Sequence, residues 1–202
     1  TGLSISAASF GSSVPHPASE ERFFRTISYN VLALRGYPER KENKSRLKLA
    51  RPQMIQRLAL ELSLYEPDLI TFQESPSEKT VARIAELMGM KYTWFPGGFP
   101  GTVLSKYEIT DSSNCPIVDN GSRPKNLFTR HWGRAVLGLQ GQELVVYSAH
   151  LHPSKQDVRE QEVNAMLEFM SADLKDGRNV ILQGDLNMEP DNPLYQRWRN
   201  AG

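Results

Sequence analysis

Five polar side chains of types that bind ligands each stand where a strand-like run of apolar residues ends. They are Asn30 in SYN, Glu74 in QES, His150 in SAHLHP, and Asp185 and Asn187 in GDLN. In sheets with strand–helix–strand connections, ligand sites lie outside the carboxyl ends of the strands, so one edge could collect all five. Each also has a structural explanation, such as a turn-forming asparagine, a helix-start carboxylate or a core histidine. Together they indicate a ligand site of carboxylate, amide and imidazole groups.

The last pair belongs to VILQGDLNMEP, residues 180–190. Its apolar start is typical of a buried strand, in which successive side chains alternate between the two faces. This alternation predicts that Asp185 and Asn187 share one face while Leu186 points to the apolar side. Gly184 permits close approach of a neighbouring backbone, and the prolines and asparagine that follow predict a turn into a helix. An isolated Asp-x-Asn is common in turns, so this segment alone does not define a site.

Composition limits the class of protein. The chain has 202 residues, 39% of them hydrophobic and 23% charged, which suits one globular domain with a buried core. No apolar run is long enough to cross a bilayer. The formal net charge of +1 gives no general attraction to nucleic acid or anionic membranes, so local groups must hold any acidic substrate. The single cysteine, Cys115, excludes an internal disulfide.

Apolar spacing predicts the elements that must position the five residues. Helical spacing predicts helices over Pro52–Tyr65, Ser77–Met88 and Asp157–Leu174. Strands are predicted over Phe24–Leu32, Asp68–Gln73, Tyr92–Phe95, Gly101–Ser105, Glu108–Asp111, Gly133–Leu139 and Glu143–Leu151, and again from Val180. The five consecutive strands in the middle favour antiparallel connections. The pattern predicts an α/β fold in which helices cover mixed sheets.

Four motifs of the chain, in this order, resemble the endonuclease/exonuclease/phosphatase superfamily: YNVL, PDLITFQE, SAHLHP and GDLNMEP. This is a group of metal-dependent phosphohydrolases similar to pancreatic deoxyribonuclease and neutral sphingomyelinase. The resemblance implies a four-layer α/β sandwich, in which two mixed, mainly antiparallel sheets pack face to face with helices outside. We expect this domain to occupy residues 25–202. The apolar pattern without the resemblance predicts only the α/β class.

The resemblance also implies a role for each polar residue. Glu74 is the expected ligand of Mg²⁺ or Mn²⁺, because such ions prefer carboxylate oxygens and keep several waters. Asn30 is expected beside that ion, as a ligand or by orienting Glu74 or a bound water. His150 would donate to the scissile phosphate, while Asp185 and Asn187 would position the attacking water and hold a phosphate oxygen. The implied activity is Mg²⁺-dependent hydrolysis of a phosphate ester by water.

The sequence departs from the family pattern after Asn187, where it contains no histidine. Family members close with a further acidic residue and an Asp-His pair, whose histidine is the general base. One interpretation is that the chain is incomplete after Gly202 and lacks its closing strands, which predicts exposed sheet edges, lower stability and an inactive fragment. The alternative is a non-catalytic binding module of the same fold that has lost its general base.

The first 24 residues differ from the rest of the chain. They lack an initiator methionine and pass from small, weakly apolar residues into a Ser/Pro-rich stretch. This pattern predicts the remnant of a signal peptide followed by a flexible tail, and therefore export to the periplasm or the cell exterior. A merely flexible tail on a cytoplasmic protein is the alternative.

The sequence restricts the substrate only broadly. Arg35–Arg57 contains eight basic and two acidic residues, which would steer a polyanion to the metal or else form a solvated loop. Arg134 is expected to support the site from a neighbouring strand. No stretch has the interleaved aromatic and basic residues of a nucleic-acid module. We expect a monomer without a transmembrane segment, acting on a phosphate ester of a nucleic acid, a phospholipid headgroup or a small phosphodiester.

Overall fold

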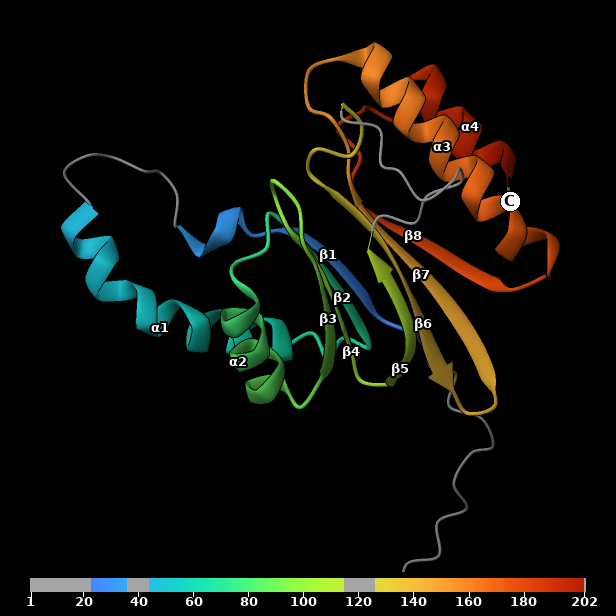
Figure 1. Cartoon of the computed structure of the whole chain (residues 1–202). Coiled ribbons are helices and arrows are strands. Elements are labelled where there is room, and N and C mark those ends of the chain that lie inside the picture. Colours follow the sequence, from blue (N-terminus) through green and yellow to red (C-terminus); the bar gives the residue numbers. More distant parts are fainter. Residues whose placement is uncertain (1–22, 36–43, 115–125, 202) are drawn as a thin grey trace, which may run out of the picture.

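Two four-stranded sheets face each other in the computed structural model, which describes residues 23–35, 44–114 and 126–201. The strand order is β1-β2-β4-β3 in the first sheet and β5-β6-β7-β8 in the second. Helices α1 and α2 lie on the outer side of the first sheet, and α3 and α4 on the outer side of the second (Figure 1). Four of the six strand pairings are antiparallel. The expected α/β sandwich with two mixed, mainly antiparallel sheets is therefore confirmed.

The first sheet places two of the candidate residues side by side. Its strands are β1 (Thr26–Asn30), β2 (Leu69–Gln73), β3 (Lys91–Phe95) and β4 (Gly101–Ser105), and its helices are α1 (Lys44–Ser63) and α2 (Glu78–Met88). Strands β1 and β2 are parallel, because α1 carries the chain back between them, and Asn30 pairs with Gln73. The carboxyl ends of these strands therefore deliver Asn30 and Glu74 to the same edge.

The second sheet does the same for His150 and Asp185. Its strands are β5 (Glu108–Asn114), β6 (His131–Leu139), β7 (Gln142–His150) and β8 (Asn179–Asp185), and its helices are α3 (Gln156–Lys175) and α4 (Pro193–Ala201). Strands β7 and β8 are parallel, with α3 as their crossover, and His150 pairs directly with Asp185. In this sheet, too, the candidate residues stand at the carboxyl ends of neighbouring parallel strands.

Three apolar layers hold the sandwich together. Ile70, Phe72 and Ile84 are among the residues packed between the first sheet and its helices. A second layer between the sheets includes Leu69, Val103, Leu137 and Val146, and a third, under α3 and α4, includes Trp132, Tyr147 and Met166. Because alternate residues of one strand point to opposite faces, Leu69 and Ile70 belong to different layers. Burial on both faces of the inner strands fixes their register.

Several element boundaries differ from the predictions. Strand β1 ends at Asn30 rather than at Leu32, because Leu32, Ala33 and Leu34 have φ of 46°, 49° and 55°, which a strand does not accommodate. Helix α1 begins at Lys44, earlier than predicted. Strand β5 continues past the predicted end at Asp111 to Asn114. The added residues are polar and lack an apolar alternation, but they pair with β6.

Some predictions fall on residues that the structure leaves undescribed. These include residues 1–22 of the expected signal-peptide remnant and residues 36–43 of the basic segment Arg35–Arg57. Export, the monomeric state and the missing closing strands stay predictions. Among the helices of the described ranges, none has the length and apolarity needed to span a bilayer.

Arg134 does not support the candidate site as expected. Its Nε and Nη2 donate to the Asp173 carboxylate of α3, each at 2.9 Å, and its Nη1 donates to Asp111 at 3.0 Å. The Tyr147 hydroxyl donates to the same carboxylate. Burial favours the neutral form of Asp173, but the hydrogen bonds from Arg134 and Tyr147 outweigh it and hold the pKa of Asp173 below its ordinary value. Arg134 therefore ties α3 to β6.

Asp173→Asn is expected to lower the free energy of unfolding by about 3 kcal/mol at neutral pH, because it breaks a buried ion pair from one side. Ionised Asp173 makes its full contribution to the free energy of unfolding at pH values above about 3.9, the ordinary pKa of an aspartate carboxyl. This contribution is lost as the pH falls through the lowered pKa that Asp173 has in the folded protein. Urea unfolding at neutral and acid pH tests this: the gap between variant and parent should narrow in acid. Asp176→Asn at the exposed end of α3 is the control. Equal stabilities at neutral pH would contradict the prediction.

Candidate active site

The carboxyl ends of β1, β2, β7 and β8 meet at one end of the sandwich. The Asn30 amide is the link: its Nδ2 donates to Asp185 Oδ2 at 3.1 Å and to Glu74 Oε1 at 3.4 Å. The first of these bonds crosses from one sheet to the other. His150 Nε2 lies 3.7 Å from the same Asp185 Oδ2. The structure therefore brings together the side chains of four of the five residues expected at the site, and the fifth, Asn187, contacts Asp185 through its main chain.

Glu74 has a backbone conformation that needs support. Its φ is 48°, a left-handed value that costs free energy for any residue with a Cβ. Main-chain hydrogen bonds hold this stretch on both sides. Ala33 N donates to the main-chain carbonyl oxygen of Glu74 at 2.6 Å, and Ser75 N donates to the carbonyl oxygen of Pro100 at 2.8 Å. This turn aims the carboxylate at Asn30 instead of continuing β2. A strained residue so firmly held is typical of functional sites.

Asn30 orients the two carboxylates. Its Oδ1 accepts a hydrogen bond from Leu32 N at 3.2 Å, which leaves the NH₂ group facing Glu74 and Asp185. Between two carboxylates, an amide that donates to both reduces their repulsion and fixes their separation. In this arrangement the amide oxygen of Asn30 is engaged by the turn after β1. The geometry thus supports the orienting role expected for Asn30 more directly than the role of a metal ligand.

His150 is a buried histidine next to an acid. Only 2% of its surface is exposed, and its Nδ1 is buried without a partner among the described residues. Burial lowers the pKa of His150, and the charge of Arg130 adds to this, while Asp185 and Glu74 oppose it. The net effect keeps the imidazole uncharged at neutral pH. An uncharged imidazole beside a carboxylate can donate one N–H and accept at the other nitrogen.

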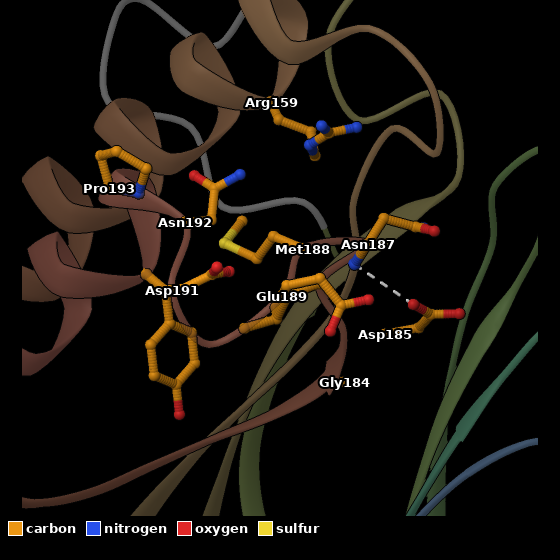
Figure 2. A pocket seen from close by; sticks show the side chains of 11 residues that line it. Arg159, Gly184, Asp185, Asn187, Met188, Glu189, Asp191, Asn192 and Pro193 are labelled. Atoms are coloured by element: carbon orange, nitrogen blue, oxygen red, sulfur yellow. Dashed lines mark hydrogen bonds between the residues drawn. The ribbon is translucent and has the colours of Figure 1, made fainter.

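Asp185 ends β8, and this corrects one prediction. Asn187 does not share a strand face with it, because the strand has ended and Asn187 has φ of 51°. Instead, Asn187 N donates to Asp185 Oδ1 at 3.2 Å (Figure 2), and its Nδ2 donates to Leu151 O at 2.9 Å. Leu186 does pack into the apolar layer under α3 and α4, as the alternation predicted.

Gly184 allows β8 to approach β7 closely. A Cβ at this position would lie 1.9 Å from the carbonyl oxygen of Ala149, its partner in the ladder. Any other residue would push β8 away and displace Asp185 from His150. The glycine noted in the sequence therefore sets the distance between two candidate site residues, His150 and Asp185.

A cavity of about 870 Å³ opens beside Asp185. Figure 2 shows Asp185, Asn187 and Glu189 along one side of it and Arg159 from α3 at another. Its remaining lining comes from the loop after β8 and the start of α4, including Met188, Asp191, Asn192 and Tyr195. The cavity is open and predominantly polar in its side chains, which suits a hydrophilic ligand.

The donor set at this edge fits a hard cation. Within the described ranges, no three His, Cys, Asp or Glu side chains form a metal-binding group. Two carboxylates held together by Asn30 nevertheless suit Mg²⁺ or Mn²⁺, which commonly use one or two protein carboxylates and keep several waters. They do not suit structural zinc, which prefers cysteine and histidine.

Phe99 and Arg130 are neighbours of the site that the sequence interpretation missed. The Phe99 ring lies 6.3 Å from the His150 ring, and the Arg130 guanidinium lies over the Phe99 ring. Both residues stand in loops, where no periodicity marks them, so only their aromatic and basic types gave a signal.

His131 packs in the interior, with its Nδ1 3.1 Å from Phe99 O. His152 stabilises a turn, because its Nδ1 accepts hydrogen bonds from Ser154 N and Lys155 N.

Comparisons with known proteins agree with this fold. The sequence profile of the Endonuclease/Exonuclease/phosphatase family matches residues 27–202. A comparison with curated proteins found no match. A truncated TDP2 of Caenorhabditis elegans is 18% identical, with a TM-score of 0.55, over 82% of this chain and 63% of that one. TDP2 of D. rerio complexed with single strand DNA product is 20% identical, with a TM-score of 0.54, over 81% and 60%. A mannosyl-6-phosphatase of Bacteroides thetaiotaomicron is 18% identical, with a TM-score of 0.65, over 88% and 70%.

These similarities differ in what they establish. At 18% and 20% identity, the solved structures share the fold with this chain, and the chain spans less than two thirds of either TDP2 chain. The family profile is more direct, because it covers the sequence from β1 to the last residue and includes all five candidate residues. The chain therefore belongs to the endonuclease/exonuclease/phosphatase family.

Proposed function

We propose that this domain is a phosphoester hydrolase that depends on Mg²⁺ or Mn²⁺. The observation that carries the proposal is the Asn30 amide, which joins the carboxylates of Glu74 and Asp185 across the two sheets beside the buried His150. Packing of the sandwich does not require two carboxylates so close together at the end of the sheets. Family membership and the fold shared with a mannosyl-6-phosphatase support the same reaction class.

The residues divide the work of hydrolysis among them. Glu74 would hold the cation, which when bound neutralises negative charge on the phosphate oxygens. Asn30 fixes the positions of the Glu74 and Asp185 carboxylates by donating to both. Asp185 accepts a hydrogen bond from the attacking water and so orients it. His150 donates a ring N–H to the phosphate as negative charge grows on its oxygens.

Asn187 is assigned to a phosphate oxygen. One hydrogen of its amide is donated to Leu151 O, which fixes the side chain next to Asp185, and the second hydrogen can be donated to the substrate. A non-catalytic module with the same site would bind cation and phosphate without turnover. Turnover therefore separates the two functions.

Removal of divalent cations is expected to abolish hydrolysis. The full-length protein, with any residues that follow Gly202, would be treated with EDTA and assayed on p-nitrophenyl phosphate and bis(p-nitrophenyl) phosphate, with Mg²⁺ or Mn²⁺ then added back. We expect full loss and full recovery, because the carboxylates of Glu74 and Asp185 repel the anionic substrate unless a bound cation offsets their charge. Circular dichroism with EDTA controls for unfolding. Turnover that survives EDTA would contradict a metal-dependent hydrolase, and cation binding without turnover on any ester would favour the binding module.

A further inference from the structure

Phe99 and Arg130 form a wall beside His150. Phe99 stands in the loop between β3 and β4, and Arg130 immediately precedes β6. The Arg130 guanidinium carbon lies 4.3 Å from the centroid of the Phe99 ring, a cation–π contact. The same ring meets His150 at a centroid distance of 6.3 Å and an angle of 62°. Arg130 is thus one aromatic ring away from a residue of the candidate active site.

The loop that carries Phe99 is held firmly against the start of β6. Gly98 N donates to Thr129 O at 3.1 Å, and His131 Nδ1 lies 3.1 Å from Phe99 O. At Gly97 the backbones are so close that a Cβ would lie 1.8 Å from the Arg130 carbonyl oxygen. The Phe99 ring nevertheless stays 41% exposed. A large aromatic side chain on a fixed loop, open to solvent beside a buried histidine, is placed to meet a ligand.

Arg130 has an acidic neighbour among the residues that the structure describes, Glu162, whose carboxylate is influenced by its charge without forming an ion pair with it. Its Nε is buried without an acceptor, and no ion pair joins its guanidinium to a described carboxylate. The nearby Glu162 carboxylate instead accepts from Phe128 N at 2.8 Å and from His152 N at 2.9 Å. The charge of Arg130 reaches the site, since it contributes to the lowered pKa of His150. A preorganised guanidinium with free donors is suited to an incoming anion.

We propose that Arg130, held over the ring of Phe99, is a phosphate-binding residue that fixes a phosphate group of the substrate next to His150. The proposal rests on the phosphoester hydrolase function above and names a positive group for its anionic substrate. Such a group is needed because the chain has almost no net charge and the site itself holds two carboxylates. The phosphate is either the scissile one or a neighbouring one on a larger substrate.

The test compares Arg130→Gln with the parent on two substrates. One is p-nitrophenyl phosphate, which has a single phosphate, and the other is thymidine 3′-phosphate 5′-(p-nitrophenyl phosphate), which has two. Loss of a charged hydrogen bond is expected to raise KM about 10- to 100-fold, with a much smaller change in kcat. A KM increase on both substrates assigns Arg130 to the scissile phosphate. An increase on the second substrate alone assigns it to the neighbouring phosphate.

Two further variants separate binding from a structural role. Arg83→Gln removes an exposed arginine that pairs with Glu86 on α2, and it is expected to leave KM unchanged. Arg130→Lys keeps the charge but loses the planar fork, so its KM should fall between those of the parent and Arg130→Gln. If Arg130→Gln does not fold, Arg130→Lys takes its place in the comparison of KM with the parent. A lower melting temperature with parental KM on both substrates would overturn the proposal, because Arg130 would then only hold the loop of Phe99.

A binding measurement keeps this proposal apart from the proposed function. Inorganic phosphate, added with Mg²⁺, is expected to raise the melting temperature of the parent and of Arg83→Gln, and to do so far less for Arg130→Gln. If the parent shows no turnover but this difference remains, the hydrolase function fails and the phosphate site stands. If the parent hydrolyses esters but phosphate stabilises Arg130→Gln as much as the parent, the hydrolase stands and the role of Arg130 is overturned.

Discussion

Glu74→Gln is expected to lower kcat/KM for Mg²⁺-dependent phosphoester hydrolysis by about 100- to 1,000-fold. The substitution keeps the size of the side chain and removes the charge that would hold the cation. It also replaces one carboxylate oxygen by an NH₂ group, which faces the Asn30 NH₂ group if it takes the place of Oε1. Both the affinity for the cation and the geometry of the amide link should therefore suffer.

The measurement pairs turnover with direct cation binding. Titration of Mn²⁺, followed by electron paramagnetic resonance, should show at least a tenfold weaker affinity in Glu74→Gln, since about 1.4 kcal/mol is enough for that change. Glu66→Gln is a matched control, because Glu66 also has φ of 48° but is exposed and pairs with Arg25 at 2.7 Å. Parental affinity and turnover in Glu74→Gln would show that Glu74 is not the ligand.

His150→Gln is expected to lower kcat by about 100- to 1,000-fold, because it removes the proposed donor to the phosphate. KM should change less, since the donor acts most strongly as charge develops on the phosphate oxygens. His152→Asn is the comparison: it removes an imidazole two residues away and keeps an acceptor for Ser154 N and Lys155 N. A kcat for His150→Gln close to that of His152→Asn would contradict a role of His150 in catalysis.

The stability of the parent should also depend on His150. Burial lowers the folded pKa of His150 against the opposing effects of Asp185 and Glu74, so the unfolded chain binds a proton at higher pH than the folded one. At pH values above about 6.5, the ordinary pKa of histidine, His150 is uncharged in both states and does not reduce the free energy of unfolding. As the pH falls below this value, the unfolded chain gains a proton first, and the free energy of unfolding declines. His150→Gln should therefore lose less stability between neutral and mildly acid pH, as measured by urea unfolding.

Much of the fold was predictable from local patterns. The strand Gly101–Ser105 was predicted with the bounds that it has, and helix α2 begins one residue after the predicted Ser77. Runs of buried residues bounded by Gly, Pro and Asn give a clear signal of this kind. Patterns failed where the backbone takes left-handed conformations at residues with a side chain, as at Leu32–Leu34 and Asn187. Such conformations are imposed by surrounding hydrogen bonds, which sequence spacing does not reveal.

The sequence by itself determined the α/β class and, through four motifs, the family, the four-layer arrangement and the five polar residues at the strand ends. The α/β class and the polar residues at strand ends follow from local order along the chain, namely apolar periodicity and a polar residue where a strand stops. The family and the four-layer arrangement follow from the resemblance of the four motifs. The order of the motifs was as informative as their content.

Only the tertiary structure decided how these residues meet. Asn30 and Asp185 lie 155 positions apart and belong to different sheets, yet one hydrogen bond joins them. Arg134, expected at the site, instead binds Asp173 in the structure. Arg130, which the sequence did not single out, lies over Phe99 beside His150. The physical reason is that face-to-face packing of two sheets sets distances between residues that no local pattern relates. Strand ends could be predicted one at a time, but their convergence required the packed sandwich.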